Sequence, residues 1–147
     1  DTLGIITDLR DSRKIYRVDL HRPNSTQMLY PFDVEVTETK AFVSLWGDGS
    51  IAVVNLKNNN KVSHIKVERH PTAMILNRDK SKLYVVNSNA DSVSVIDTKL
   101  EKVIETITLK LAEDEPIGTS PEGLCLSDDE KTLYVTNDMY VLRIKLK

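Results

Sequence analysis

The sequence predicts an all-β protein built from tandem, sheet-forming repeats. The clearest repeat spans residues 71–97 (PTAMILNRDKSKLYVVNSNADSVSVID). It recurs at residues 121–145 (PEGLCLSDDEKTLYVTNDMYVLRIK) and, more loosely, at residues 31–55 (PFDVEVTETKAFVSLWGDGSIAVVN). The prolines that open these units are 40 and 50 residues apart, a spacing typical of β-propeller blades. No segment places apolar residues at helical spacing over a usable length, so we expect a β-propeller of four-stranded antiparallel blades.

One unit shows how its strands are defined. Residues 92–97 (SVSVID) alternate in polarity, which is the period-2 pattern of a strand, and residues 82–87 (KLYVVN) form the strand before it. Between them, residues 88–91 (SNAD) supply Asn and Asp, which tolerate the left-handed backbone of tight turns. Residues 72–76 and 102–109 are the first and fourth strands, so the unit is predicted to be an antiparallel meander.

Alignment of the units extends this prediction to the whole chain. We expect the third strands of successive units to end, in chain order, at Asp19, Asn55, Asp97 and Lys145. Residues 3–8 and 14–20 then become the second and third strands of an incomplete first unit, with a fourth strand near residues 27–29. The resulting fourteen strands form two full and two incomplete blades of one partial domain. Its repeat units are approximately 1–30, 31–70, 71–120 and 121–147.

Each of the last three units also places an aromatic residue in the middle of its second strand. These residues are Phe42, Tyr84 and Tyr134. A large aromatic side chain at a repeated position can fill the space between neighbouring sheets. We therefore expect the three residues to have equivalent surroundings.

The composition is that of an ordinary globular domain, with 40% apolar and 29% charged residues. The 20 Lys and Arg residues are balanced by 22 Asp and Glu, and no basic run occurs, which argues against nucleic acid as a partner. No stretch reaches the roughly 20 apolar residues of a membrane-spanning helix. The sole cysteine, Cys125, lies between Leu124 and Leu126 and is expected to be a small buried residue. The chain opens at Asp1 without a signal peptide, and we expect a processed or trimmed N-terminus.

Two short motifs carry a family resemblance. Residues 84–87 (YVVN) and 134–137 (YVTN) each follow a polar turn, and residues 84–87 precede a Val-rich strand, so the chain resembles the YVTN family of β-propeller repeats. Residues 116–137 further resemble the propeller part of proteins in which such repeats precede an alkaline-phosphatase-like phosphoesterase domain. Residues 42–46 (FVSLW) depart from the motif. The resemblance implies a periplasmic, cell-surface or secreted protein.

The turns of successive blades supply candidate ligand-binding residues. Loops on one face of a propeller collect around its channel, where carboxylates, amides and aromatic rings can bind a cation or polar ligand. The candidates are Trp46, Asp48, His70, Asn89, Asp91 and Asp138. The competing interpretation is structural: Asx side chains cap tight turns, and the Trp46 indole packs between blades. His70 precedes a proline just as Tyr30 and Ser120 do, so it also fits a simple blade entrance.

No catalytic motif can be named. The chain has no Gly-rich phosphate loop and no Ser/His/Asp order, and its five glycines are too few for a nucleotide cradle. His21 and His64 have no partner at zinc-ligand spacing. We therefore expect no catalytic residue, no metal and no cofactor in this segment.

Two classes of function remain open. The first is a non-catalytic propeller module for interaction or scaffolding, which recognises a protein or a small polar ligand. The second is part of an enzyme, either a lactonase-like or dehydrogenase-like propeller or an accessory domain of a phosphoesterase. Incomplete blades expose strand edges and apolar faces, so we expect a segment of a longer propeller. Self-association through the open blade edges is the rival hypothesis.

Overall fold

The computed structural model describes residues 1–6, 15–58, 60–109 and 119–146 of the chain. These residues form thirteen β-strands and one turn of 3-10 helix, and they contain no α-helix. The elements are β1 (Thr2–Ile6), β2 (Ile15–Asp19), β3 (Pro31–Val36), β4 (Lys40–Leu45), β5 (Ser50–Asn55), β6 (Lys61–Lys66), β7 (Pro71–Leu76), β8 (Lys82–Asn87), η1 (Ser88–Ala90), β9 (Ser92–Asp97), β10 (Lys102–Thr108), β11 (Gly123–Leu126), β12 (Thr132–Thr136) and β13 (Val141–Lys145).

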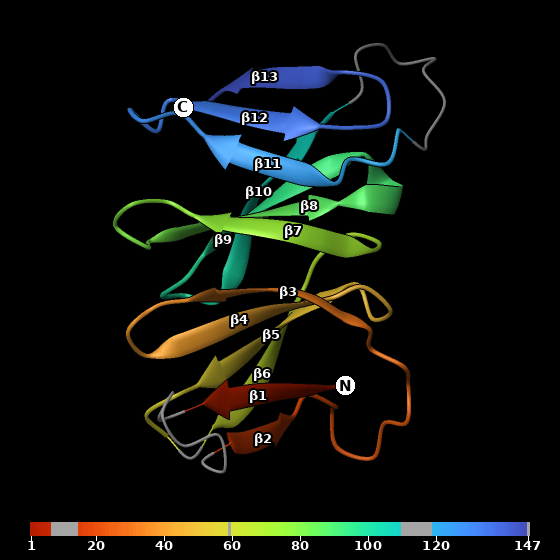
Figure 1. Ribbon diagram of the computed structural model, residues 1–147, viewed down its shortest axis with the longest axis vertical. Helices are drawn as coiled ribbons and strands as arrows, with labels where there is room; N and C mark the ends of the chain where they lie inside the picture. Colours follow the sequence, from red (N-terminus) through yellow and green to blue (C-terminus); the bar gives the residue numbers. More distant parts are fainter. Residues whose placement is uncertain (7–14, 59, 110–118, 147) are drawn as a thin grey trace.

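The strands form four sheets that stack along the chain (Figure 1). We name them in chain order: the first sheet is β1-β2, the second β3-β4-β5-β6, the third β7-β8-β9-β10 and the fourth β11-β12-β13. Each pairing joins consecutive strands in antiparallel orientation. These stacked meanders are the partial β-propeller that the repeats predict.

The first sheet corrects the predicted strand alignment. The Leu20 N–H donates to the Asp1 carbonyl over 3.2 Å, as the Leu109 N–H donates to the Asp91 carbonyl over 2.8 Å. In the third sheet this bond closes the third and fourth strands, β9 and β10. Thus β1 and β2 are the third and fourth strands of a blade, whereas the sequence alignment predicts the second and third.

The strand expected near residues 27–29 is therefore absent, because β2 already fills the fourth position. Residues 27–29 instead cross the turn between β4 and β5. The Gly47 N–H donates to the Leu29 carbonyl over 2.8 Å, and the Gln27 side-chain amide donates to the Gly47 carbonyl over 2.8 Å. The parts of the predicted first-unit strands that fall within residues 7–14 lie outside the described residues.

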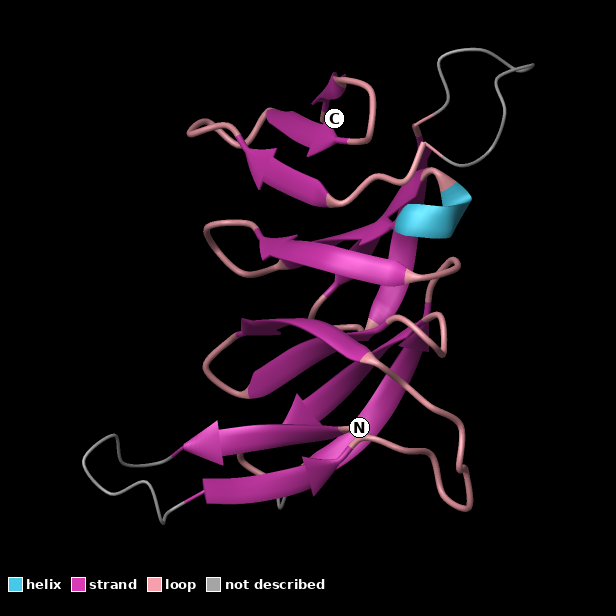
Figure 2. Ribbon diagram, turned by 45° about the vertical axis from the view of Figure 1, so that its right-hand side comes forward, coloured by secondary structure: helices cyan, strands magenta, loops and turns pink. Residues whose placement is uncertain are grey.

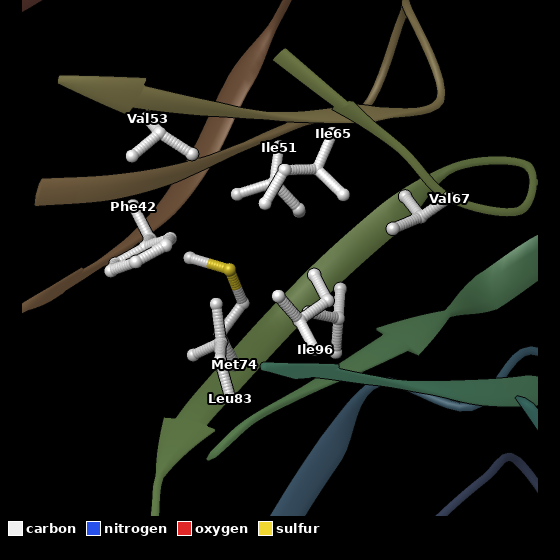
Figure 3. Close-up of a cluster of buried hydrophobic side chains, with 9 residues drawn as sticks. Phe42, Ile51, Val53, Ile65, Val67, Met74, Leu83 and Ile96 are labelled. Carbon is white, nitrogen blue, oxygen red and sulfur yellow. The ribbon is translucent and has the colours of Figure 1, made fainter. Parts of the chain in front are cut away.

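Apolar side chains between the sheets form the core. Phe42 and Met74 meet in the cluster between the second and third sheets (Figure 3). Phe42 is fully buried there, and Tyr84 occupies the equivalent place against the fourth sheet. Tyr134 is only half-buried, because no further sheet is described beyond it. All three aromatic residues lie in the middle of the second strand of their units, but the expected equivalent surroundings hold only for Phe42 and Tyr84, because no described sheet covers Tyr134.

Cys125 is exposed, which corrects the expectation that it is buried. Leu124 and Leu126 pack against the cluster that contains Tyr84. Because side chains alternate along a strand, Cys125 points to the opposite face of the fourth sheet. It lies there opposite Tyr134 in the ladder, on the face without a described neighbour.

Candidate functional site

Turns and blade entrances gather along one side of the stack, where the same ends of the strands lie (Figure 1), and we call this side the loop end. It comprises the turn between β4 and β5, the η1 turn, the turn between β12 and β13, and the segments that lead into β3, β7 and β11. Figure 2 shows η1 at this end, beside the turns of the neighbouring sheets. All six candidate residues named from the sequence lie at the loop end.

The loop end carries a cluster of three rings: Tyr30, Trp46 and His70. The Trp46 indole stacks on the His70 imidazole with centroids 3.9 Å apart and 7° between the planes. Tyr30 meets the same indole edge-on, with centroids 6.0 Å apart and an angle of 85°. The Trp46 side chain stays 37% exposed and Tyr30 52% exposed. The cluster is thus ordered by stacking and still open to a partner.

The local sequence explains how the rings meet. Tyr30 and His70 immediately precede the first strands of the second and third sheets, and both adopt positive φ, of 49° and 54°. Ser120 has the same conformation, with φ of 45°, so the left-handed residue is a shared feature of blade entrances. Gly47 lets Tyr30 approach closely, because a Cβ there would lie 2.9 Å from the tyrosine ring.

The His70 ring also holds an unused polar atom. Its Nδ1 is buried and has no hydrogen-bond partner among the residues that the structure describes. A buried nitrogen without a partner is costly, and such atoms call for an explanation.

Asp48 lies in the turn beside Trp46 and is tied to its surroundings. Its carboxylate accepts from Arg22 Nη1 over 2.6 Å and from the Ser50 hydroxyl. Burial raises the pKa of Asp48, but the hydrogen bonds from Ser50 and Arg22 outweigh burial and hold the pKa below its usual value. Asp48 therefore remains a carboxylate and anchors Arg22 at the loop end.

Asp91 has a structural task in the neighbouring turn. Its carboxylate accepts from the Thr119 N–H over 3.0 Å and from the Thr119 hydroxyl over 2.8 Å. The Asp138 N–H in turn donates to the Thr119 carbonyl over 3.1 Å. Asp138 and Asn89 are exposed. The structure thus places Trp46, Asp48 and His70 together and connects Asp91 and Asp138 through Thr119, whereas Asn89 is placed only by its position in η1.

Two loop-end residues were missed by the sequence reasoning as site residues. The repeat pattern marks Tyr30 only as the residue before Pro31, although an aromatic residue at a blade entrance, like His70, is a usable signal. Arg22 belongs to a segment without repeat character, and no sequence pattern links it to Asp48, 26 positions later.

The described part of the chain contains no group of three or more His, Cys, Asp or Glu side chains arranged to hold a metal ion. His64 uses its Nε2 on the Leu20 carbonyl at 2.8 Å, and His21 Nδ1 lies 2.6 Å from an Asp19 oxygen. No helix within the described residues combines the length and apolar character that crossing a membrane requires.

Comparisons with known proteins agree with the fold. No family model matches the chain. It is 28% identical over 132 residues to the uncharacterised protein YncE of Salmonella typhimurium, across 90% of this chain and 35% of that protein. The chain is therefore similar to a curated relative of which it spans about a third.

Comparison with solved structures identifies the fold class of the chain. The hydrazine synthase of Kuenenia stuttgartiensis matches with a TM-score of 0.68 and 27% identity, over 85% of this chain and 36% of that chain. The periplasmic gluconolactonase PpgL of Pseudomonas aeruginosa matches with a TM-score of 0.69 and 15% identity, over 80% and 37%. The structural neighbours are β-propeller folds. The class of this chain is that of a partial β-propeller.

Proposed function

We propose that this chain is part of a longer β-propeller that works as a non-catalytic binding module, with the loop end as its recognition surface. The observation that carries this proposal is the stacked cluster of Tyr30, Trp46 and His70. Its rings come from two adjacent sheets, so a partner would contact a surface that the rigid scaffold holds in place. The bound partner is a protein or a small polar ligand.

The residue types around the cluster support recognition. Met28 is 57% exposed and precedes Tyr30 by two positions, while Arg22 lies beside the neighbouring Asp48. Aromatic residues, Met and Arg are enriched in the centres of protein interfaces, where Trp, Tyr and Arg often dominate the binding energy. A surface that combines these residue types is suited to a partner with both apolar and polar groups.

We further propose that residues 1–147 form a single partial domain of YVTN-type repeats and that the protein acts in the periplasm, at the cell surface or after secretion. The motifs YVVN, on β8, and YVTN, which begins on β12, support the repeat type. The periplasmic location of the gluconolactonase neighbour supports the compartment.

One observation favours an enzymatic alternative. His70 lies among the candidate residues of the loop end, and histidine is the residue that most often serves as a general base in enzymes. The structural neighbours also include a gluconolactonase and a virginiamycin B lyase. A lactonase-like activity of the complete propeller is therefore the second candidate function.

The binding proposal can be tested through Trp46, the sole tryptophan of the chain. We expect at least one probe among monosaccharides, glucono-lactone and short Arg-containing or aromatic peptides to change the Trp46 emission saturably. Tyr30→Ala should weaken this binding by about tenfold or more, since a central aromatic contact contributes more than about 1.4 kcal/mol. Leu100→Ala serves as the control, because Leu100 is equally exposed but lies in the turn between β9 and β10.

Two results would decide against the binding module. Trp46 emission that stays constant with every probe would contradict the proposal that the loop end is a recognition surface. Turnover of glucono-lactone, lost in His70→Ala and kept in Leu100→Ala, would favour the enzymatic alternative.

A further inference from the structure

One apolar face of the second sheet is open. Val34 and Val36 of β3 are 46% and 45% exposed. Their counterparts in the third sheet are Met74 and Leu76, because Val34 pairs with Val43 as Met74 pairs with Val85. Met74 is only 5% exposed, since the second sheet covers it. The first sheet gives no such cover to β3.

The open face continues an interface that is already formed. Val34 and Val36 lie opposite Val43 and Ala41 in the β3–β4 ladder, so all four side chains share one face of the sheet. Val43 and Ala41 are buried against Leu3 and other apolar residues of the first sheet. The packing between the first two sheets therefore covers β4 and stops short of β3.

The cause is the alignment of the first sheet. Because β1 and β2 hold the third and fourth positions of a blade, the first and second positions would lie beside β1, and no described strand occupies them. Among the described strands, β1 pairs only with β2. A hollow of about 190 Å³ lies between β1 and β3, where it is lined by Thr2, Leu3, Phe32 and Val34 among others. Phe32 is 60% exposed beside it.

We propose that a two-stranded β-hairpin fills this place and completes the first sheet. One strand of the hairpin pairs antiparallel with the free edge of β1, and the other covers Phe32, Val34 and Val36 with alternating apolar side chains. The hairpin belongs to the same propeller, beyond the 147 residues of this chain. This inference rests on the proposal that the chain is part of a longer propeller, and it concerns a different surface from the loop end.

A second copy of the chain is a poor occupant. Its open sheet is the fourth one, whose last strand β13 also holds the third position of a blade. Closing a ring with copies would therefore put two third-position strands, β13 and β1, side by side. In a common ring these two strands run in the same direction, whereas every described pairing is antiparallel.

The chain itself supplies a probe for the missing hairpin. Residues 71–90 contain β7, β8 and η1, the first two strands of the third sheet and the turn after them. In that sheet Asp91 follows this segment, and Asp1 occupies the position of Asp91 in the first sheet. A second copy of residues 71–90 fused directly before Asp1 therefore joins β1 in the correct register.

We expect the fused hairpin to slow amide exchange in β1 by about tenfold or more and to raise Tm by at least about 4 °C, because it closes an edge and buries an apolar face. A fusion with one additional Gly before Asp1 is the matched control. A shift of one residue turns every side chain to the other face, so this fusion should give neither effect.

A second variant connects the effect to the open face. Val34→Asp should leave Tm of the original chain almost unchanged, because Val34 is exposed, and should remove the gain in the fused chain. Equal protection by both fusions, or a gain that survives Val34→Asp, would overturn the proposal. If the fused chain does not fold, the peptide of residues 71–90 is added to the original chain, and unchanged β1 exchange at saturating peptide overturns it. Sedimentation that shows closed rings of the original chain, with β1 protected, also overturns it. The Trp46 binding assay is independent of these results.

Discussion

The Asp33 carboxylate of β3 accepts a hydrogen bond of 2.8 Å from the backbone N–H of Met74 in β7. β7 is the edge strand of the third sheet, so its outward N–H groups have no partner within that sheet. The other Asp33 oxygen accepts from the Val34 N–H over 2.8 Å. One side chain thereby satisfies an edge strand and connects two sheets at their first strands.

We expect Asp33→Ala to lower the free energy of unfolding by about 1–3 kcal/mol, because it leaves the half-buried Met74 N–H without a partner. Urea unfolding measures the change. Glu38→Ala is the control, since Glu38 is exposed in the turn between β3 and β4 and should change stability by less than about 0.5 kcal/mol. Equal effects of both substitutions would show that the bond between the sheets contributes nothing measurable.

Glu35, two residues further along β3, predicts a pH dependence. Burial raises the pKa of Glu35, the nearby Asp33 charge raises it further, and a hydrogen bond from the Leu76 N–H only partly opposes them. The folded protein therefore binds this proton more tightly than the unfolded chain. By linkage, the contribution of Glu35 to stability falls as pH rises from the ordinary Glu pKa of about 4.3 through the raised folded value.

The measurement is the difference in unfolding free energy between the wild type and Glu35→Gln across this pH range. Gln cannot ionise, so the variant should become relatively more stable than the wild type as pH rises. The comparison is needed because carboxyls with lowered pKa values, such as Asp48, act in the opposite direction. A difference that is constant with pH would contradict the prediction.

The two aromatic positions Phe42 and Tyr134 predict unequal costs of truncation. Phe42 is fully enclosed between the second and third sheets, so Phe42→Ala should lower the free energy of unfolding by about 3–5 kcal/mol. Tyr134 has the same place in its strand but lies on the face of the fourth sheet that has no described neighbour, so Tyr134→Ala should lower the free energy of unfolding by less than half as much. Thermal unfolding of both variants tests this, and similar losses would indicate that Tyr134 is enclosed in solution.

Most strands could be predicted from the repeat, because turn residues and period-2 alternation are local properties. The hairpin of β8 and β9 has the predicted bounds, 82–87 and 92–97. The strand predicted at residues 102–109 is one residue too long, because β10 ends at Thr108 and Leu109 is buried in the core. The stacking of sheets followed from the repeated aromatic position.

The alignment of the first sheet could not be obtained in the same way. The strands of a unit are short, and most contain β-branched residues. The alternation of side chains therefore cannot show whether β1 and β2 are the second and third or the third and fourth strands of a blade. The distinction depends on a backbone bond, from Leu20 to Asp1, which leaves no mark in side-chain pattern. The prediction that Cys125 is buried is wrong for a related reason. Its leucine neighbours indicate an apolar environment, whereas the alternation of side chains places Cys125 on the other face of the sheet.

At the loop end, the sequence identified the turns but not their contacts. Trp46 and His70 were chosen separately, and their stacking depends on how the second and third sheets are placed. The competing structural interpretation fits Asp91, which holds Thr119. For Trp46 the packing on the His70 ring fits the structural interpretation, and its role in ligand binding stays a prediction.

Gly47 offers a direct test of the aromatic cluster. A Cβ at this position would lie 2.3 Å from the Met28 carbonyl oxygen and 2.9 Å from the Tyr30 ring. The backbone of the segment before β3 must therefore move in Gly47→Ala. We expect this variant to lose about 1–3 kcal/mol of unfolding free energy, as other overpacked sites do. Gly4→Ala in β1 is the matched control, because nothing lies within 4 Å of a Cβ there.

The two glycine variants should also differ in the near-ultraviolet circular dichroism that ordered aromatic rings produce. Displacement of Tyr30 breaks its edge-on contact with Trp46. Gly47→Ala should therefore change this signal and weaken the binding of any probe at the loop end. Gly4→Ala should leave both unchanged, since β1 lies outside the cluster. An unaltered aromatic signal in a folded Gly47→Ala protein would mean that the close approach of Tyr30 to Gly47 does not determine the arrangement of the rings.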